Sequence, residues 1–362
     1  PVPKAKDTKQ NYDLHPWSTG PYKIQSYDRG KQMTLVRNKF WDPKTDPLRQ
    51  AYPDTIKVKF GYEQNALEQQ FVADSGEARS AMSLDTQIVT NIATVAGNSK
   101  YKDRFIGFDS PYVRYLAINM DKVTDVNVRK AIQCAIDLKT VLLAAGGSNA
   151  GVYTSSLIPS FVKPAYRSFT LCGRDVKTKP EAQTLLAKGY LAKAAVKKTD
   201  LTLAYRDKGV EPARAAAAQQ ALEAAGFNIT MVKLPRAGYY TAIGKRGTPE
   251  EYDIVQTSWG FDWPYASGIV YALLDGATMT EGDSHSNYSR QNVPALQAMF
   301  RQADKTINSA AQEKLLGDID QKAVQDYAAV VPTFVETSNF MFGSKLGGVQ
   351  ADYGYGTISP LY

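Results

Sequence analysis

The chain has 362 residues, of which 43% are hydrophobic and 22% are charged, and its formal net charge is +7. This length favours two lobes over a single core, and no apolar run reaches the roughly eighteen residues of a membrane-spanning helix. The basic residues are dispersed and are not interleaved with aromatic residues, which excludes a typical nucleic-acid surface and favours a solvated basic surface.

The first part of the chain is rich in expected strands. Alternating hydrophobic residues predict a hairpin over 18–41 and a third, half-buried strand over 54–62. A short helix is expected from residue 65, and it should end near the Ser75–Gly76 turn signal.

The middle of the chain alternates between strands and helices. A strand over 112–120 is followed by one long expected helix over 125–147, which Asp125 can cap. A short helix is expected over 180–190, and from residue 200 a β-α-β-α-β order implies a largely parallel sheet covered by helices. Further helices are expected at about 264–274, 293–306 and 310–326, and closing strands are expected over 329–346.

The order of these elements predicts the domain organisation. We expect a hinge lobe formed by residues 1–112 and completed by 335–362, and an α/β lobe formed by residues 113–334. Two crossovers between lobes are typical of a hinged protein with a cleft. The predicted fold class is therefore α/β, with two lobes and mixed β-sheets flanked by helices.

Cysteine and histidine are scarce, which limits the chemistry available. The chain has two cysteines, Cys134 and Cys172, and two histidines, His15 and His285. Metal sites built on paired cysteines are excluded by this count, while a disulfide and two free thiols both remain open. Neither histidine lies in a recognisable catalytic motif, so both are interpreted as polar surface or turn residues.

Three motifs, in order, resemble those of one protein family. They are "STGPYKIQSYDRGKQMTLVRNKFW" (18–41), "YLAINMDKVTDVNVRKAIQCAIDLKTVL" (115–142) and "YDIVQTSWGFDWPYAS" (252–267). These segments resemble the signatures of the extracellular solute-binding proteins of family 5, the oligopeptide- and nickel-binding proteins of ABC importers. The resemblance runs from about residue 18 to the end of the chain.

The resemblance implies a Venus-flytrap fold of type II that captures a peptide or related amine-bearing solute between its lobes and delivers it to a membrane permease. It implies a monomer without catalysis, cofactor or nucleic-acid partner. It also implies a place in the periplasm or, lipid-anchored in the full-length form, at the extracellular face of the cytoplasmic membrane. In the family a substantial portion precedes the hairpin, so we expect a C-terminal fragment.

The resemblance also implies a ligand site. Carried over by motif, the aspartate that holds the free amine of a peptide is Asp262, and the backbone at Ser258 and Gly260 flanks the ligand. The candidate ligand-binding residues are Asp262, Gly260, Ser258, Trp259, Trp263 and Tyr115, with no catalytic or metal-ligating residue.

The residues themselves allow a second interpretation of this segment. If 257–263 is extended, Trp259, Phe261 and Trp263 share one face and Asp262 lies on the other. Alternatively, Asp262 caps a helix that starts near Pro264, and the aromatic side chains belong to the core.

Three further residues near this site have open roles. Tyr115 either lines the cleft wall or packs at the lobe junction. Arg114 is expected to be an exposed strand residue; the alternative is that it binds a carboxylate of the ligand. His285 lies in a polar stretch, 282–292, expected near the cleft mouth, and a lone histidine is weak evidence for a metal site.

Two other functions compete with transport. A relative of the same fold acting as an envelope sensor or regulator is not distinguished by sequence. A hydrolase that uses paired carboxylates is a further alternative, although no G-x-S-x-G and no H-E-x-x-H motif occurs.

Overall fold

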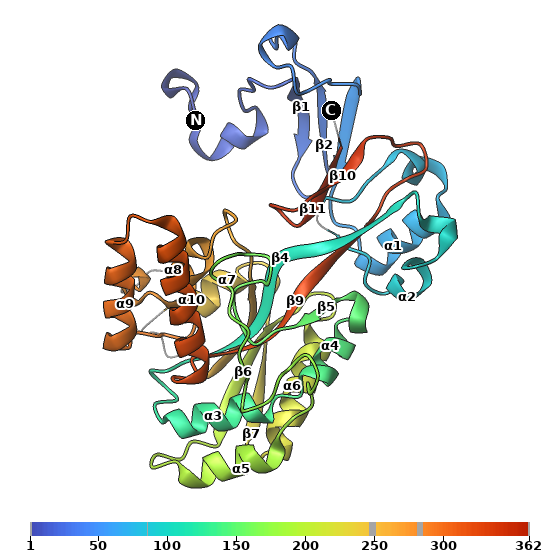
Figure 1. Cartoon of the computed structure of the whole chain (residues 1–362). Helices are drawn as coiled ribbons and strands as arrows, with labels where there is room; N and C mark the ends of the chain where they lie inside the picture. The colour runs from blue at the N-terminus through green and yellow to red at the C-terminus, as the bar shows by residue number, and fades with distance from the viewer. Residues whose placement is uncertain (1, 85, 246–250, 281–284, 361–362) are drawn as a thin grey trace. The chain divides into compact units, whose positions relative to one another are not determined.

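The computed structural model describes residues 2–84, 86–245, 251–280 and 285–360, and Figure 1 shows the course of the chain. The chain forms two compact units. Unit 1 comprises Pro1–Ile106, Phe340–Ala351 and Thr357–Tyr362, and unit 2 comprises Gly107–Asn339 and Asp352–Gly356. From the sequence, the boundaries between the lobes were expected at residues 112 and 334. That these parts act as a hinge lobe and a ligand-binding lobe stays a prediction.

Unit 1 is built on a three-stranded antiparallel sheet. Its strands are β1 (Tyr22–Asp28), β2 (Gln32–Arg37) and β3 (Thr55–Lys59), with Leu35 of β2 opposite both Ile24 and Ile56. The hairpin and the third strand are therefore as the alternation of hydrophobic residues predicted. The remaining elements are α1 (Gln64–Ala73), α2 (Ile92–Val95), β10 (Val349–Asp352), β11 (Thr357–Pro360) and the 3₁₀ turns η1 (Lys4–Lys6), η2 (Lys9–Leu14), η3 (Pro43–Thr45), η4 (Gly76–Ser80) and η5 (Ser99–Tyr101).

Unit 2 contains a six-stranded mixed sheet in the order β5-β9-β4-β8-β6-β7. The strands are β4 (Phe105–Ile118), β5 (Gly151–Tyr153), β6 (Asp200–Arg206), β7 (Asn228–Leu234), β8 (Ile254–Trp259) and β9 (Val330–Met341). Strand β6 pairs in parallel with β7 and β8, whereas β4–β8 and β5–β9 are antiparallel. The expectation of a largely parallel sheet is thus correct only for the strands joined by crossover helices.

The helices of unit 2 pack in groups. They are α3 (Val126–Ala135), α4 (Leu138–Ala144), α5 (Thr184–Lys193), α6 (Glu211–Ala224), α7 (Tyr239–Gly244), α8 (Ser267–Leu274), α9 (Pro294–Asp304) and α10 (Ser309–Gln325), with the 3₁₀ turns η6 (Gly147–Asn149) and η7 (Gly276–Thr278). Helix α3 packs on α5, α4 packs on α6, and α10 packs on both α8 and α9 (Figure 1). The expected α/β fold class, with a mixed sheet flanked by helices, is confirmed.

One long helix was expected where the structure has two. Helix α3 ends before Ile136, which is extended with ψ 122°, and α4 starts after Asp137. The Asp137 side chain accepts a hydrogen bond from the Thr140 N–H at 2.9 Å. The prediction of a continuous helix is wrong because Asp137 provides an N-cap that starts a new helix.

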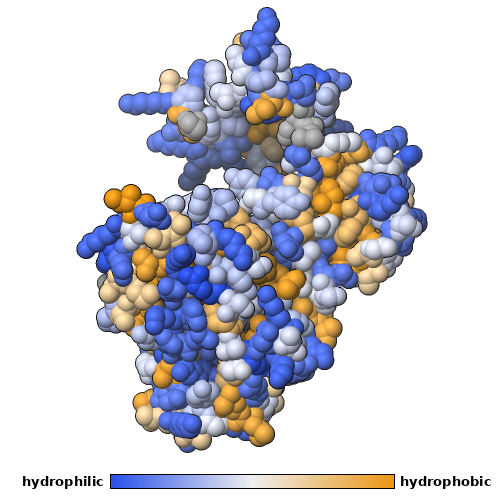
Figure 2. Space-filling view, in the orientation of Figure 1, coloured by the Kyte–Doolittle hydropathy of each residue, from blue (hydrophilic) through white to orange (hydrophobic). Residues whose placement is uncertain are grey.

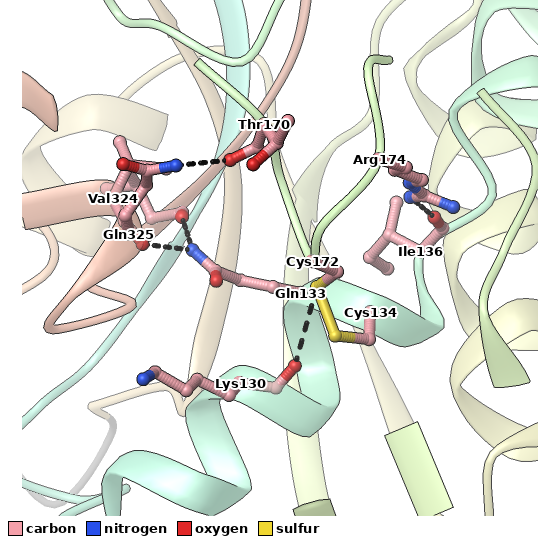
Figure 3. The surroundings of a disulfide bond; sticks show 10 residues. Lys130, Gln133, Cys134, Ile136, Thr170, Cys172, Arg174, Val324 and Gln325 are labelled. Atoms are coloured by element: carbon pink, nitrogen blue, oxygen red, sulfur yellow. Dashed lines mark hydrogen bonds between the residues drawn. A yellow bond between two sulfur atoms is a disulfide. The ribbon is translucent and has the colours of Figure 1, made fainter. Parts of the chain in front are cut away.

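The two cysteines form a disulfide at the C-terminal end of α3. Cys134 and Cys172 lie 5.5 Å apart between Cα atoms and are 38 residues apart in the sequence (Figure 3). Beside them, the Gln133 side-chain amide donates to the carbonyl oxygens of Val324 and Val330 at 2.8 and 2.7 Å. The disulfide alternative is confirmed, and the bond ties the 170–174 loop to the helix.

The visible surface carries mostly hydrophilic residues with hydrophobic ones scattered between them (Figure 2). Within the described parts of the chain, none of the helices combines the length and the apolar character required to cross a bilayer.

Helix α10 carries a buried carboxylate. Asp320 has no exposed surface, and its oxygens accept hydrogen bonds from the Ser156 hydroxyl at 2.6 Å and the Leu157 N–H at 3.2 Å. Burial outweighs these hydrogen bonds and raises the pKa of Asp320 to about 6.

This burial predicts a dependence of stability on pH. The Asp320 carboxyl has a pKa of about 6 in the folded chain and about 3.9 in the unfolded chain. The folded state therefore binds this proton more tightly, and the resulting stabilisation is complete below pH 4. That contribution, about 3 kcal/mol, is lost as the pH rises through 6. We expect Asp320→Asn to remove this dependence, so that wild type loses stability relative to the variant between pH 4 and pH 7. Urea unfolding at several pH values measures it, and a constant difference across that range would contradict it.

Candidate functional site

The candidate site lies where strand β8 ends. In the ladder with β4, Ser258 is opposite Arg114 and Trp259 is opposite Val113. The strand stops at Trp259, and residues 262–265 form bends that lead into α8. The expectation that 257–263 is extended is therefore correct only as far as Trp259. Pro264 has no N–H to donate to a sheet ladder, so the segment cannot continue as a paired strand through that residue.

The three aromatic side chains of this segment separate instead of sharing a face. Trp259 is partly buried and its indole N–H donates to the Gly268 carbonyl at 2.9 Å. Phe261 is buried and meets Phe161 edge-to-face at 6.0 Å between ring centroids. Trp263 is 50% exposed. The predicted common aromatic face is wrong, because alternation ends with the strand.

Asp262 is exposed at this strand end. Within the described residues its carboxylate has neither a hydrogen bond nor an ion pair. Burial raises the pKa of the Tyr112 phenol, and the nearby carboxylates of Glu336 and Asp262 raise it further. Asp262 therefore lies within electrostatic reach of Tyr112.

The alternative role for Asp262, as a helix cap, is wrong. Helix α8 begins at Ser267 with Ala266 in the N-cap position, and the Ala266 side chain accepts no hydrogen bond from the first N–H groups of the helix. Instead the Ala266 N–H donates to the Glu313 carboxylate of α10 at 2.9 Å. Asp262 lies four residues before this position and is left for another role.

Gly260, two residues before Asp262, lies against the ring of Tyr112. A Cβ atom added to Gly260 would lie 2.6 Å from the Cε1 atom of the Tyr112 ring, which is too close for any side chain. Tyr112 itself is partly buried. Glycine is thus required here by the close approach of the tyrosine ring.

The other two candidate residues are buried. Ser258 is 9% exposed, and Tyr115 is 1% exposed within the main core of unit 2. Burial raises the pKa of Tyr115 well above its ordinary value, and its hydroxyl finds no hydrogen-bond partner in the described part of the chain. This position corresponds to the packed alternative considered for Tyr115, and contact with a ligand stays a prediction.

Arg114 is partly buried and belongs to an ion-pair network, which corrects the expectation of an exposed strand arginine. Its side chain is 16% exposed and donates to Glu211 at 2.9 Å and to Glu336 at 2.6 Å. Burial opposes the charge on Glu211, yet the surrounding guanidinium groups, led by Arg214, hold the pKa of that carboxyl below its usual value.

Glu211 is the centre of the network. It also pairs with Arg214 at 3.1 Å and Arg206 at 3.6 Å, and accepts from the Gln256 amide at 2.7 Å. Helix α6 is thereby tied to strands β4, β6 and β8. Sequence reasoning missed this cluster, since a glutamate before a proline at a helix start gives no sign of its distant partners.

Asp253 is a second residue that sequence reasoning did not single out. Its carboxylate accepts from the N–H and the hydroxyl of Thr202, both at 2.9 Å, and pairs with Lys198 at 2.5 Å. The aspartate of the "YD" pair thus aligns the start of β8 with β6. The available signal was its place in the quoted motif.

The polar stretch 282–292 is described only from residue 285. His285 is 9% exposed, and its Nε2 atom lies 2.7 Å from a guanidinium nitrogen of Arg290. Residues 281–284 lie outside the described residues, so the expected position of this stretch near a cleft mouth stays a prediction.

Comparisons with known proteins agree with the motifs. The family model "Bacterial extracellular solute-binding proteins, family 5 Middle" matches residues 1–281. A curated relative, the dipeptide-binding protein DppE of Bacillus subtilis, is 25% identical over 214 residues, which is 56% of this chain and 36% of the relative.

Solved structures show the same fold. Clavulanic acid biosynthesis oligopeptide binding protein 2 has a TM-score of 0.84 at 23% identity, over 99% of this chain and 65% of that one. The murein tripeptide binding protein MppA of Escherichia coli has a TM-score of 0.78 at 16% identity, over 100% and 69%. DppA of Helicobacter pylori, in complex with the peptide STSA, has a TM-score of 0.74 at 16% identity, over 95% and 63%.

These relatives are longer than the present chain, which spans 36% of DppE and 65% of the clavulanic acid biosynthesis protein. The family match nevertheless covers well over half of the 362 residues and includes all three quoted motifs. The chain therefore belongs to the bacterial extracellular solute-binding proteins of family 5.

Proposed function

We propose that the protein is the substrate-binding component of an ABC importer, which captures a peptide or a related amine-bearing solute and delivers it to a membrane permease. It works as a monomer outside the cytoplasm and catalyses no reaction. Family membership supports this proposal, as do relatives named as dipeptide-, tripeptide- and oligopeptide-binding proteins.

The observation that carries the proposal is the exposed carboxylate of Asp262 at the carboxyl end of strand β8. Ligands of α/β folds bind outside the carboxyl ends of strands. A carboxylate that pairs with none of the described residues suits a ligand ammonium group, because a charge-assisted hydrogen bond strengthens as water is excluded.

The surroundings of Asp262 suit a peptide backbone. Gly260 is partly exposed and carries no side chain that would hold a ligand backbone away. Half of the Trp263 side chain is exposed, and an indole ring offers a large apolar contact surface to a side chain of any sequence. Such contacts favour the peptide class over one particular peptide.

The expected result of the Asp262→Asn substitution is weaker peptide binding. Loss of a hydrogen bond between charged groups corresponds to a reduction in affinity of about 10- to 100-fold. Isothermal titration of the full-length gene product with trialanine measures the effect. Glu223→Gln, which changes an exposed carboxylate on α6, serves as the control, and equal affinities for wild type and Asp262→Asn would overturn the amine anchor.

A further inference from the structure

Helix α8, which follows the candidate site, begins without a side-chain cap from its own N-cap residue. Ala266 occupies the N-cap position and has no side-chain acceptor. The hydroxyl of Ser267, the next residue, accepts the Trp263 indole N–H at 2.9 Å. The first N–H groups of a helix need partners from elsewhere when the local sequence offers none.

Glu313 of α10 supplies the missing acceptor. It is 3% exposed, and its Oε2 atom accepts from the Ala266 N–H at 2.9 Å. A carboxylate at this position also interacts favourably with the positive end of the helix dipole. Burial raises the pKa of Glu313, and only the backbone N–H groups of Ala266 and Ser267 counteract that effect. The contact therefore stands on hydrogen bonding to the helix start and not on an ion pair.

The anchored residue is closely coupled to Asp262. The Tyr265 N–H donates to the Trp263 carbonyl at 2.7 Å, and the Gly268 N–H donates to the Tyr265 carbonyl at 3.1 Å. A Cβ atom on Gly268 would lie 3.2 Å from the Trp263 carbonyl and 3.4 Å from the Asp262 nitrogen, so this turn folds tightly against the helix start. Ala266 directly follows Tyr265 in the chain, so a displacement of Ala266 would move Tyr265 and disturb these contacts.

We propose that Glu313 is a positioning residue for the ligand site, holding the Asp262–Trp263 turn in place through Ala266 without touching the ligand itself. The effect on binding rests on the proposed function, whereas the effect on the turn does not. Glutamine at position 313 keeps a carbonyl oxygen at the same reach, so Glu313→Gln should preserve what Glu313→Ala removes.

The first experiment needs no ligand. The chain has four tryptophans, and incorporated 5-fluorotryptophan gives each a ¹⁹F resonance, with that of Trp263 assigned from Trp263→Phe. In the full-length gene product we expect Glu313→Ala to shift or broaden the Trp263 resonance and Glu313→Gln to leave it unchanged. Asp320→Ala is the matched control, because it removes another buried carboxylate of α10 that contacts Ser156 and Leu157. An unchanged Trp263 resonance in Glu313→Ala, or the same change in Asp320→Ala, overturns the proposal.

The second experiment measures trialanine affinity by titration calorimetry. Loss of a helix cap corresponds to a decrease of about fivefold in trialanine affinity for Glu313→Ala. Glu313→Gln should bind trialanine nearly as wild type does, and the affinity of Asp320→Ala should be unchanged. Equal affinities for Glu313→Ala and wild type overturn the link to binding. If wild type binds no peptide, the proposed function fails while the ¹⁹F result still decides the role of Glu313. If Glu313→Ala does not fold, Glu313→Asp shortens the reach by one methylene and takes its place in both experiments.

Discussion

Replacement of both disulfide cysteines by alanine is expected to lower the free energy of unfolding of unit 2 by about 4 kcal/mol. The Cys134–Cys172 bond closes a segment with a sequence separation of 38, and a cross-link of that span restricts the unfolded chain strongly. Cys134 lies at the end of α3 with no exposed surface, so alanine fits without a new steric contact.

Urea unfolding followed by far-ultraviolet circular dichroism measures this effect on Cys134→Ala/Cys172→Ala. Wild type unfolded in the presence of a reductant is the matched control and should resemble the double variant. A loss below about 1 kcal/mol would show that the cross-link does not restrict the unfolded chain as argued.

The Glu211→Gln substitution is expected to destabilise unit 2 by about 3 to 5 kcal/mol, because removing one member of a buried ion pair leaves the other charge uncompensated. Arg214 has a side chain only 2% exposed and would lose its partner at 3.1 Å. Of its two ion pairs within the described residues, Arg114 would keep the one with Glu336. Glutamine has nearly the size of glutamate and keeps an oxygen that can accept from the Gln256 amide. The effect therefore reports the loss of charge and not a change in packing.

An exposed ion pair gives the matched control for this measurement. Lys233 and Asp207 pair at 3.3 Å with side chains 61% and 51% exposed, and such pairs contribute about 1 kcal/mol or less. Asp207→Asn should therefore have little effect on chemical denaturation. Addition of Arg214→Met to Glu211→Gln should restore part of the lost stability, and similar losses for Glu211→Gln and Asp207→Asn would contradict the account.

Local patterns predicted much of the fold. Alternation of hydrophobic residues predicted strands β1, β2 and β3, and the order of elements after residue 200 predicted β6, α6, β7, α7 and β8. In these segments side-chain periodicity and turn residues act together. The break before Asp137 was missed because a capping aspartate inside a long periodic pattern resembles an ordinary polar position.

The candidate site was predictable by position but not by conformation. The motif singled out Asp262, yet the bends of residues 262–265 depend on contacts that the sequence does not reveal. The partners involved are distant, since Glu313 lies 47 residues from Ala266 and Glu211 lies 97 residues from Arg114. Pairs of this kind are set by how helices pack on the sheet, which single-sequence patterns do not specify.

The most direct test of the central claim compares trialanine with its N-acetylated form, on wild type and on Asp262→Asn of the full-length gene product. The two ligands differ at the N-terminus, where acetylation replaces the ammonium group that Asp262 is proposed to hold by a neutral amide. Titration calorimetry should show that wild type prefers the free amine by about 10- to 100-fold and that Asp262→Asn loses this preference. Equal binding of both peptides by wild type, or a preference that persists in the variant, would contradict the claim.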